Sequence, residues 1–283
     1  MPEEFLFCNF CGKKGNPVWS ENNYEVLKCN SCGLIWLGKG RQSKDISLYD
    51  ESYFNKWYIK HEDRRKQYFK LKIKEIEKMY PIDSFKSANK KVLDVGCGVG
   101  LFLEAAKENG WECYGLETSQ FAADYSRKKL KIDVYSDDLL RASIPENCFD
   151  LITMWDVVAH VNDPKGYLLK IKQLLKPKGM LVIKTPDHPQ VLFGLAKIIS
   201  FFRQSKGLVH VPAQIYHFNV RSLKNNLEKL GYRVMKIEKT KEALRSNWTN
   251  SKIKNLIIHF SILLMKIFGV SESIIIYAVQ KEQ

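Results

Sequence analysis

The sequence lacks the features that mark membrane-spanning, secreted and repetitive proteins. It contains no low-complexity tract, no internal repeat and no run of the ~20 uncharged apolar residues that a membrane-spanning helix needs. Its first residues, MPEEFLFCNF, carry acids where a secretory signal peptide carries bases. The length of 283 residues suits one large α/β domain with a small appendage. We therefore expect a globular protein of the cytoplasm.

Acidic residues are in short supply. Lysine and arginine outnumber aspartate and glutamate by 45 to 31, which gives a formal net charge of +14, and the lysines are spread along the chain without a long block of like charges. Such a charge favours anionic partners, which include nucleic acid, phosphorylated metabolites and an acidic membrane surface. A solvated lysine-rich surface explains the same composition, so the charge alone does not choose a partner.

The sequence also lacks an even number of cysteines: it has 7. An odd number argues for a reducing compartment rather than a disulfide framework. Four of them form two CxxC pairs, each followed by a glycine that suits a tight turn: Cys8, Cys11, Cys29 and Cys32. Four thiolates around one ion are typical of structural zinc and leave no open position for a substrate. The stretch between the pairs, NPVWSENNYEVLK, predicts a β-hairpin. We predict a small four-cysteine zinc ribbon over residues 1–40.

Residues 41–89 read as a linker and an N-terminal helix. The part over 38–59 predicts a linker that carries aromatic side chains, and the part over 61–80 predicts an amphipathic helix that ends before Pro81. The apolar positions of this helix are Tyr68, Leu71, Ile73, Ile76 and Met79.

Strand-like and helix-like segments alternate over residues 90–283, which predicts a mostly parallel sheet with helices on both faces. In such sheets the ligand binds at the carboxyl ends of the strands. Two strongly apolar stretches, 191–202 and 253–270, interrupt the alternation, and the second is an amphipathic insertion before the last strand. Each could pack as a core helix or lie in a membrane interface, and both readings stay open.

The segment VLDVGCGVG joins a predicted strand to a predicted helix, with Asp94 ahead of glycines at positions 96, 98 and 100. Glycines at this point let the backbone approach a ligand closely. The spacing differs from a phosphate-binding fingerprint and no P-loop lysine follows, which favours a ligand other than a pyrophosphate. Glu117 ends the next predicted strand about twenty positions on, where a ribose diol would be held.

This segment resembles the first motif of class I S-adenosylmethionine-dependent methyltransferases. CYGLE, YSDDL, FDLITMWDVVAHVNDP and LLKPKGMLVIKTP resemble the second to fifth strand segments of that family, in order, over about residues 50–240. The cysteine pairs followed by LYDESYF resemble a subgroup with a zinc-ribbon extension before a UbiE/UbiG-like core. The resemblance implies an α/β, Rossmann-like sheet of seven strands whose last strand is reversed, with S-adenosyl-L-methionine as cofactor and structural Zn²⁺ in the ribbon.

The resemblance also implies which residues contact the cofactor. Asp94 and the glycine loop would hold the methionine part, Glu117 the ribose hydroxyls, and Asp138 the adenine amino group, with Asp137 as an alternative. The full predicted set is Asp94, Gly96, Cys97, Gly98, Gly100, Glu117, Thr118, Asp137, Asp138, Leu139, Met154 and Trp155. Glu117 and Asp138 could instead be loop acids that cap helices.

The chain departs from the family on the acceptor side. Many relatives read EH where this chain has Ala159-His160, so any function of that glutamate is absent here. The predicted catalytic residues are His160, Asp156 and His217. His160 suits a general base because the pKa of histidine lies near neutrality, but it could equally support the loop by a hydrogen bond. His217 could also belong to a lead-in to a helix capped by Asn219.

These patterns favour a methyltransferase that acts on a small molecule, with O-methylation of a sugar or polysaccharide precursor or of a phenolic lipid as the expected reaction. The acceptor would be anionic or lipid-linked, and peripheral contact with the inner face of the membrane stays open. Nucleic acid is not the expected partner, because no [ND]PP[YF] motif is present and few basic residues flank the cysteine pairs. A zinc-containing RNA methyltransferase and a binding protein that has lost catalysis are the alternatives.

The ribbon is expected to stay outside the chemistry. Its four thiolates would close the coordination of zinc, and the glycine-rich segment accounts for the reaction alone. We therefore expect the ribbon to shape access of the acceptor through Trp19, Tyr24 and Trp36. The acceptor atom and the oligomeric state are not specified by the sequence.

Overall fold

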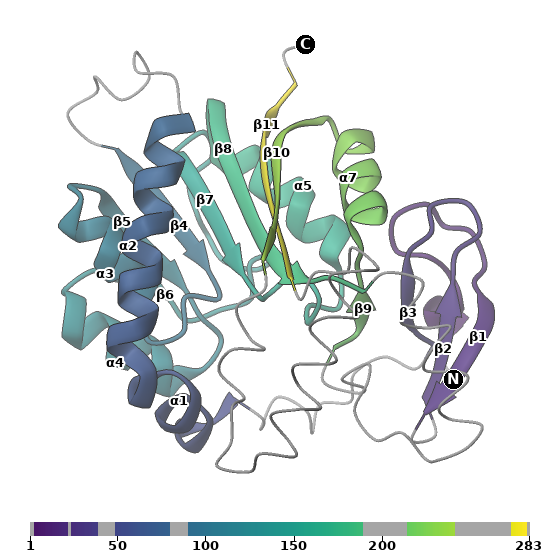
Figure 1. The fold of residues 1–283 in the computed structure, drawn as a ribbon, viewed down its shortest axis with the longest axis horizontal. Helices are drawn as coiled ribbons and strands as arrows, with labels where there is room; N and C mark the ends of the chain where they lie inside the picture. The colour runs from purple at the N-terminus through teal and green to yellow at the C-terminus, as the bar shows by residue number, and fades with distance from the viewer. Residues whose placement is uncertain are drawn as a thin grey trace, which may run out of the picture.

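The main body of the protein is an α/β domain built on one twisted sheet (Figure 1). The computed structural model describes residues 3–21, 24–38, 49–79, 90–188, 214–240 and 273–281. Both apolar stretches singled out in the sequence, 191–202 and 253–270, lie outside the described residues. Within the described ranges, no helix is long and apolar enough to cross a membrane.

The main sheet has seven strands in the order β10-β11-β8-β7-β4-β5-β6. The strands are β4 (Lys91–Val95), β5 (Glu112–Leu116), β6 (Asp133–Tyr135), β7 (Phe149–Trp155), β8 (Leu175–Pro186), β10 (Tyr232–Thr240) and β11 (Ser273–Gln280). Neighbouring strands are parallel from β6 to β8, whereas β11 is antiparallel to both β8 and β10. This confirms the predicted Rossmann-like, seven-stranded sheet with a reversed last strand.

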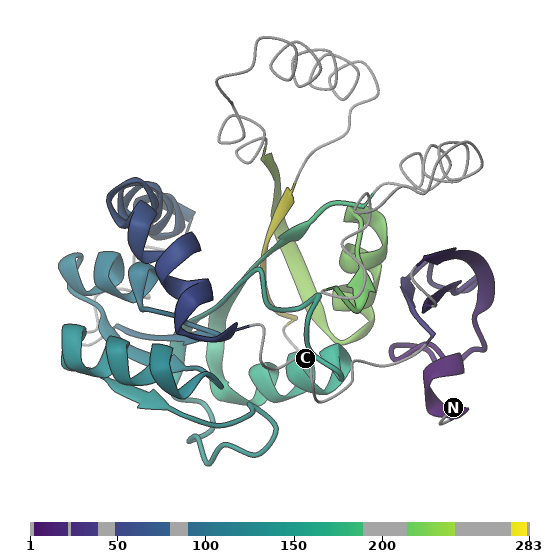
Figure 2. The same cartoon turned by 90° about the horizontal axis from the view of Figure 1, so that it is seen from below.

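Helices cover both faces of this sheet (Figure 2). They are α2 (Glu62–Met79), α3 (Leu101–Glu108) and α4 (Gln120–Leu130) on one face, and α5 (Pro164–Leu174) and α7 (Val220–Lys229) on the other. Alternate residues of each strand point to opposite faces of the sheet. Val92 packs against α2 and α3, whereas Leu93 packs against α5 and α7. The strands are therefore buried on both sides, as parallel strands are.

The segment before the sheet differs in part from its prediction. The helix predicted over 61–80 is present as α2, but Leu71 is 69% exposed, and Phe69 packs against the core instead. The aromatic stretch predicted as a linker contains a helix, α1 (Glu51–Trp57), and a short 3-10 turn, η3 (Ile59–His61). Asp50 starts α1 by accepting a hydrogen bond from the backbone N–H of Tyr53 at 2.9 Å, which is a helix-capping signal that the aromatic content obscured.

The boundary between α5 and β8 falls within LLKPKG. Helix α5 ends at Leu174, and β8 begins at Leu175 in extended backbone. Pro177 explains this, because a proline disfavours helical backbone at the residue before it.

The N-terminal residues form a second, smaller sheet. It contains β1 (Asn16–Glu21), β2 (Tyr24–Lys28) and β3 (Ile35–Leu37), preceded by the 3-10 helix η1 (Glu3–Leu6). The predicted hairpin is therefore present. The fourth strand, β9 (Tyr216–His217), comes from the chain after β8 and completes the order β1-β2-β3-β9. The sheet thus crosses the predicted domain limits of 1–40, 41–89 and 90–283, which stay predictions.

Candidate functional site

The glycine-rich loop follows β4 at the carboxyl end of the parallel strands. Gly96, Gly98 and Gly100 have φ angles of 72°, 53° and 79°, in the left-handed region that side chains rarely adopt. A β-carbon at Gly98 would lie 3.3 Å from the ring of Phe54 in α1. The loop therefore turns on residues without side chains and packs beneath α1, so its backbone can approach a neighbouring group closely.

Asp94, the last residue but one of β4, is a buried carboxyl at the base of this loop. It is 2% exposed and accepts a hydrogen bond from Thr153 Oγ1 at 2.6 Å. Burial, helped by the nearby Glu117 and opposed by the Thr153 hydrogen bond, raises the pKa of Asp94 to about 8. Among the described residues no cation pairs with Asp94, so the site suits a ligand that brings a positive charge.

Glu117 follows β5 and is joined directly to the glycine loop. Its Oε2 accepts from the backbone N–H of Gly98 at 2.8 Å, and its Oε1 accepts from the N–H of Ser119 at 2.9 Å. The carboxyl is 8% exposed, and burial raises its pKa above the usual range. A carboxylate has two acceptor oxygens side by side, which is the chemistry that a ribose diol requires.

The two acids after β6 differ in their surroundings. Asp138 accepts from Tyr167 Oη at 2.6 Å and from the backbone N–H of Leu140 at 2.9 Å, so its carboxylate is fixed. The side chain of Asp137 is 49% exposed and accepts from the N–H of Asp138 at 2.7 Å. The fixed carboxylate of Asp138 is the better candidate for orienting an adenine amino group, and the assignment stays a prediction.

The remaining predicted cofactor contacts fall into distinct surroundings. The thiol of Cys97 packs toward β5, because a β-carbon at Gly115 would lie 2.7 Å from its Sγ; Cys97 can therefore offer a ligand only its backbone. Met154 and Leu139 are fully buried in the core beneath α5. Thr118 is exposed beside Glu117.

Trp155 points to the opposite face of the sheet from Met154. Its ring packs against Phe69 of α2 and Phe102 of α3, with centroids 5.2 and 5.3 Å away. Its Nε1–H is buried and has no acceptor among the described residues. The indole is thus held by packing, with one polar atom that a ligand could satisfy.

The predicted catalytic residues lie on the loop after β7 and on β9. Asp156 has a φ of 61°, which is strained for a residue with a side chain, and its carboxylate contacts Lys184 Nζ at 3.1 Å. His160 Nδ1 lies 3.3 Å from the hydroxyl of Tyr49, just before α1. His217 is fully buried in β9, edge-on to His188 with ring centroids 4.9 Å apart. Its catalytic role stays a prediction, while Asn219 does cap α7 as the alternative reading expected.

The sequence reasoning missed the aromatic cover supplied by α1 and its flanks. Tyr49, Tyr53, Phe54 and Tyr58 form a cluster with ring centroids 5.0 to 5.7 Å apart. The backbone carbonyl of Tyr49 accepts from Ser119 Oγ at 3.0 Å, which anchors the cluster beside Glu117. The Asp50 cap followed by closely spaced aromatics was the available signal. The arrangement places aromatic side chains beside the glycine loop and Glu117.

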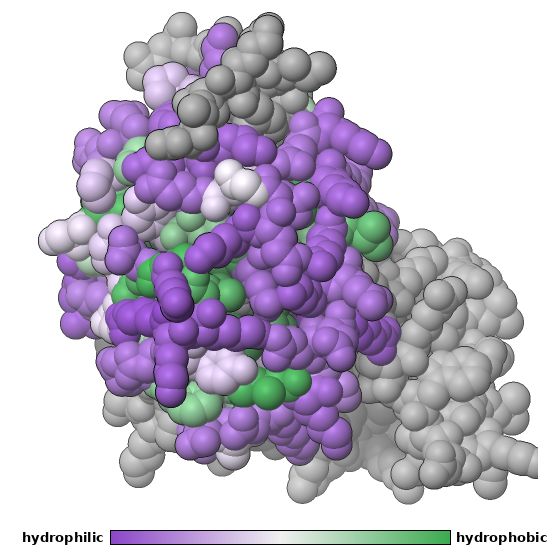
Figure 3. Space-filling model, turned by 90° about the vertical axis from the view of Figure 1, so that its left-hand side faces the viewer, coloured by the Kyte–Doolittle hydropathy of each residue, from purple (hydrophilic) through white to green (hydrophobic). Residues whose placement is uncertain are grey.

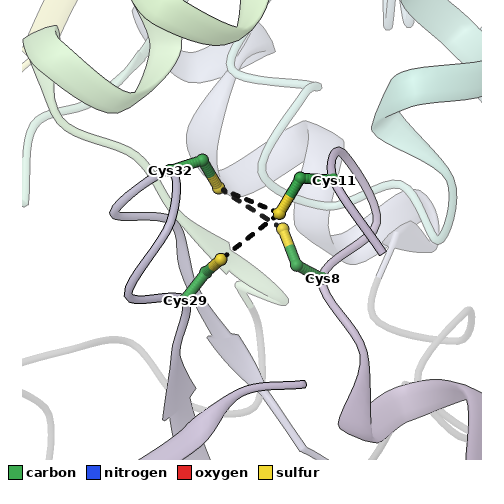
Figure 4. Close-up of side chains that lie close together, drawn as sticks. All are labelled: Cys8, Cys11, Cys29 and Cys32. Carbon is green, nitrogen blue, oxygen red and sulfur yellow. Dashed lines mark hydrogen bonds between the residues drawn. The ribbon is translucent and has the colours of Figure 1, made fainter. Parts of the chain in front are cut away.

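The four predicted zinc ligands come together (Figure 4). The sulfurs of Cys8, Cys11, Cys29 and Cys32 lie within 4.8 Å of one another, with separations of 3.4 Å for two pairs and 4.0 Å for a third. A tetrahedral zinc at ~2.3 Å from each thiolate would place the sulfurs about 3.8 Å apart, so the cluster fits that ion. Trp36 is 3% exposed, and its Nε1 donates to the carbonyl of Phe5, so the expectation that it shapes an opening is wrong.

Comparison with known proteins agrees with this geometry. A family model described as a methyltransferase domain matches residues 61–237, more than half of the chain. A ubiquinone biosynthesis O-methyltransferase of Actinobacillus pleuropneumoniae is 33% identical over 106 residues, which cover 34% of this chain and 45% of that protein. The protein of the same name from Bartonella tribocorum is 27% identical over 182 residues, 61% of this chain and 72% of that protein. The chain thus spans less than half the length of the first of these relatives.

Solved structures agree as to the fold. A crystal structure described as a SAM-dependent methyltransferase from Archaeoglobus fulgidus superposes with a TM-score of 0.53 at 22% identity, and covers 79% of this chain and 100% of that one. The glycine loop and the acid after β5 both lie within the residues that the family model matches. The chain therefore belongs to the methyltransferase-domain family, and its residues 61–237 match a class I S-adenosylmethionine-dependent methyltransferase domain.

Proposed function

We propose that this protein transfers the methyl group of S-adenosylmethionine to an oxygen atom of a small molecule. The observation that carries the proposal is the buried Asp94 at the base of the glycine loop together with Glu117, which accepts a hydrogen bond from Gly98 in that loop, beneath the aromatic cover of α1. It offers a buried acid for a cationic group and a bidentate acid for a diol, at the strand ends where this fold binds ligands.

The residues would divide the work as follows. Asp94 and the bare backbone from Gly96 to Gly100 would hold the methionine part, Glu117 the ribose and Asp138 the adenine. The bound cofactor supplies an already electrophilic methyl group on a sulfonium. The chain therefore has mainly to align the acceptor and exclude water, and alignment of this kind can contribute ~7–11 kcal/mol.

An alcohol acceptor would have to lose a proton, and His160 is the candidate to take it. His160 lies on the loop after β7, and Tyr49 contacts its Nδ1 from the side of α1. Asp156 is the second candidate, although Lys184 already contacts its carboxylate. Relatives named for O-methylation in ubiquinone biosynthesis support oxygen as the acceptor atom.

The acceptor class follows from charge and from the apolar sequence segments. A net charge of +14 supports an anionic or lipid-linked sugar or phenolic acceptor, and peripheral contact with the inner face of a membrane belongs to the same proposal. We further propose that the four-cysteine cluster binds one structural Zn²⁺.

The surface gives less support to a nucleic-acid substrate. The face seen in Figure 3 is largely hydrophilic, with small apolar areas scattered across it. On α2, Lys66 lies 2.6 and 2.7 Å from Glu104 and Glu108, and Lys70 lies 2.8 Å from Glu108. These cations are engaged within the protein, so they form no continuous positive stripe for a phosphate backbone.

The first experiment tests cofactor binding at Glu117. In Glu117→Gln one carboxylate oxygen becomes an amide nitrogen, so the N–H of Gly98 or of Ser119 faces a donor instead of an acceptor. The negative charge that would face the ribose hydroxyls is also lost. We expect the affinity for S-adenosylmethionine by titration calorimetry to fall roughly 10–100-fold. Glu112→Gln is the matched control, because it removes a carboxylate from the other end of the same strand, beside Lys91. Unchanged affinity in Glu117→Gln would refute the assignment.

The second experiment tests the reaction. The protein is incubated with methyl-labelled S-adenosylmethionine and separate sugar-nucleotide, phenolic-lipid and RNA fractions. We expect label in one of the small-molecule fractions, on oxygen. Transfer to RNA with a steep salt dependence would favour the RNA methyltransferase instead, and absence of transfer to every fraction would favour the binding protein that has lost catalysis.

A further inference from the structure

The side chain of Asn9 ties the first cysteine pair to the start of α5. Asn9 stands between Cys8 and Cys11, and its Nδ2 donates to Asp163 Oδ1 at 2.9 Å. Its Oδ1 accepts from the backbone N–H of Lys165 at 2.9 Å. The N–H groups in the first turn of a helix have no partner within the helix. Here a side chain 156 positions away supplies one, at the start of α5.

Asp163 completes the same junction. It is the N-cap of α5, and its Oδ1 also accepts from the N–H of Gly166 at 2.8 Å. Asp163 and Asn9 therefore cap the same end of α5. Asp163 accepts from the N–H of Gly166, and Asn9 accepts from the N–H of Lys165. Between β7 and this cap runs the segment of residues 156–163, called here the β7–α5 loop, which carries Asp156 and His160.

Strand β9 holds the same loop from a second point on the ribbon. It pairs with β3, and the N–H of Leu37 donates to the carbonyl of Ile215 at 2.9 Å. The N–H groups of Ile215 and Tyr216 both donate to the carbonyl of Ala159, at 2.9 and 3.0 Å. Tyr216 Oη donates to the carbonyl of Asn162 at 2.9 Å. The ribbon thus reaches the residues on either side of His160.

The cofactor side is held without the ribbon. The hydrogen bonds given for Asp94 and Glu117 come from Thr153, Gly98 and Ser119, all within the main domain. The ribbon lies beside α7 and β9, on the far side of the molecule from α2 in both views (Figures 1 and 2). The two halves of the site therefore have separate supports.

We propose that the ribbon positions the acceptor side of the site, and that Asn9 is the positioning residue through which the zinc-bound knuckle orders the β7–α5 loop. A ribbon of this size has too little apolar surface to hold its knuckles in shape without a metal. Zinc binding would fix the turn that presents Asn9, and Asn9 would fix the loop. The role of this loop ordering in catalysis rests on the proposed function, whereas the ordering of the loop by zinc and Asn9 does not.

The test compares two asparagines in equivalent places. Asn9 is the second residue of CNFC, and Asn30 is the second residue of CNSC and is exposed. Zinc-loaded full-length protein is prepared as wild type, Asn9→Ala and Asn30→Ala. Amide hydrogen exchange is followed by mass spectrometry over 156–163 and over the glycine loop. Zinc content is measured by colorimetric release, and S-adenosylhomocysteine affinity by calorimetry.

We expect exchange over 156–163 to become ~5–10-fold faster in Asn9→Ala, the size of effect that the loss of a helix cap produces. Exchange of the glycine loop, zinc content and cofactor-product affinity should stay at wild-type values. Asn30→Ala should match wild type throughout, and removal of zinc by a chelator should reproduce the faster exchange of Asn9→Ala. Unchanged exchange over 156–163 in Asn9→Ala, or after zinc removal, would overturn the proposal.

A reciprocal exchange of side chains separates hydrogen bonding from simple packing. Asn9→Asp places a second carboxylate against Asp163, and Asp163→Asn removes the acceptor for Asn9 or for Gly166. In the double variant, the amide introduced by Asp163→Asn can donate to the carboxylate introduced by Asn9→Asp. Exchange over 156–163 should then return toward the wild-type rate. A double variant that exchanges as fast as the faster single variant would contradict the assigned pairing. If labelled methyl transfer fails while this pattern holds, only the proposed function falls.

Discussion

Asp94 and Glu117 are the residues whose chemistry depends most on burial. Both were predicted from their positions at the ends of neighbouring strands, and in the structure Glu117 accepts a hydrogen bond from Gly98, in the loop that follows Asp94. Their raised pKa values, dominated by desolvation, could not be predicted from sequence, because the water around a carboxyl is removed by segments distant along the chain. Perturbed acids in one cluster are typical of functional sites.

The raised pKa of Asp94 predicts how stability depends on pH in the ligand-free protein. The carboxyl titrates near 3.8 when unfolded and near 8 when folded. Between these values the folded state binds more protons, so the free energy of unfolding decreases as pH rises from about 4 to 8 and then levels off. Asp94→Asn keeps an acceptor for Thr153 but removes the titration. The stability advantage of wild type over Asp94→Asn should therefore fall by a few kcal/mol across this range.

Urea unfolding of both proteins at pH 5 and pH 8 measures this difference. Asp124→Asn is the control, because Asp124 is exposed and its pKa is lowered by a hydrogen bond from Gln120 and by Arg127. A wild-type advantage over Asp94→Asn that does not change with pH would show that Asp94 ionises normally in the fold.

At the scale of elements, α1 decides whether the glycine loop is covered. The segment LYDESYFNKWY was expected to be part of a linker that carries aromatic side chains. Its helix has only 7 residues, too few to be stable alone, and it forms because Phe54 is buried against the loop. Tertiary contact overrode a weak local signal here.

Two aromatic residues of α1 make a matched pair for testing this cover. Phe54 is 4% exposed, whereas Trp57 is 49% exposed on the same helix. We expect Phe54→Ala to lower the free energy of unfolding by ~3–5 kcal/mol and to weaken binding of S-adenosylhomocysteine, because the loop loses its cover. Trp57→Ala should change stability by no more than ~0.5 kcal/mol. Denaturant melts and calorimetry measure the two effects, and equal behaviour of the two variants would argue against a covering role.

The whole molecule is less modular than its sequence suggests. The sequence predicts that the ribbon is a separate unit held together by a metal. In the structure, however, Cys8, Leu27 and Trp36 belong to the same buried cluster as Tyr216 and Phe218. Phe10 meets Phe218 edge-on, with ring centroids 6.2 Å apart. The ribbon is therefore continuous with the core on the α5 and α7 side of the sheet.

Phe10→Ala should accordingly destabilise the whole chain. We expect its melting temperature to fall by roughly 3–8 °C in a single transition, since the apolar contact it removes is shared by both sheets. Phe7→Ala is the control, because Phe7 lies in the same ribbon but is 45% exposed. Two separate transitions, with the main domain melting as in wild type, would restore the modular interpretation.

The sequence by itself determined the fold class, the four cysteines that cluster and the acids at the strand ends. These depend on local spacing: glycines where the backbone must turn, CxxC pairs where two thiols must face one ion, and alternation of strand and helix. Only the tertiary structure decided that α1 covers the glycine loop, that His217 is buried against His188, and that β9 joins the ribbon to the main domain. A two-residue strand such as β9 has no periodicity of its own, and its place is set by the edge of β3 and the carbonyl of Ala159, which lie far from it along the chain.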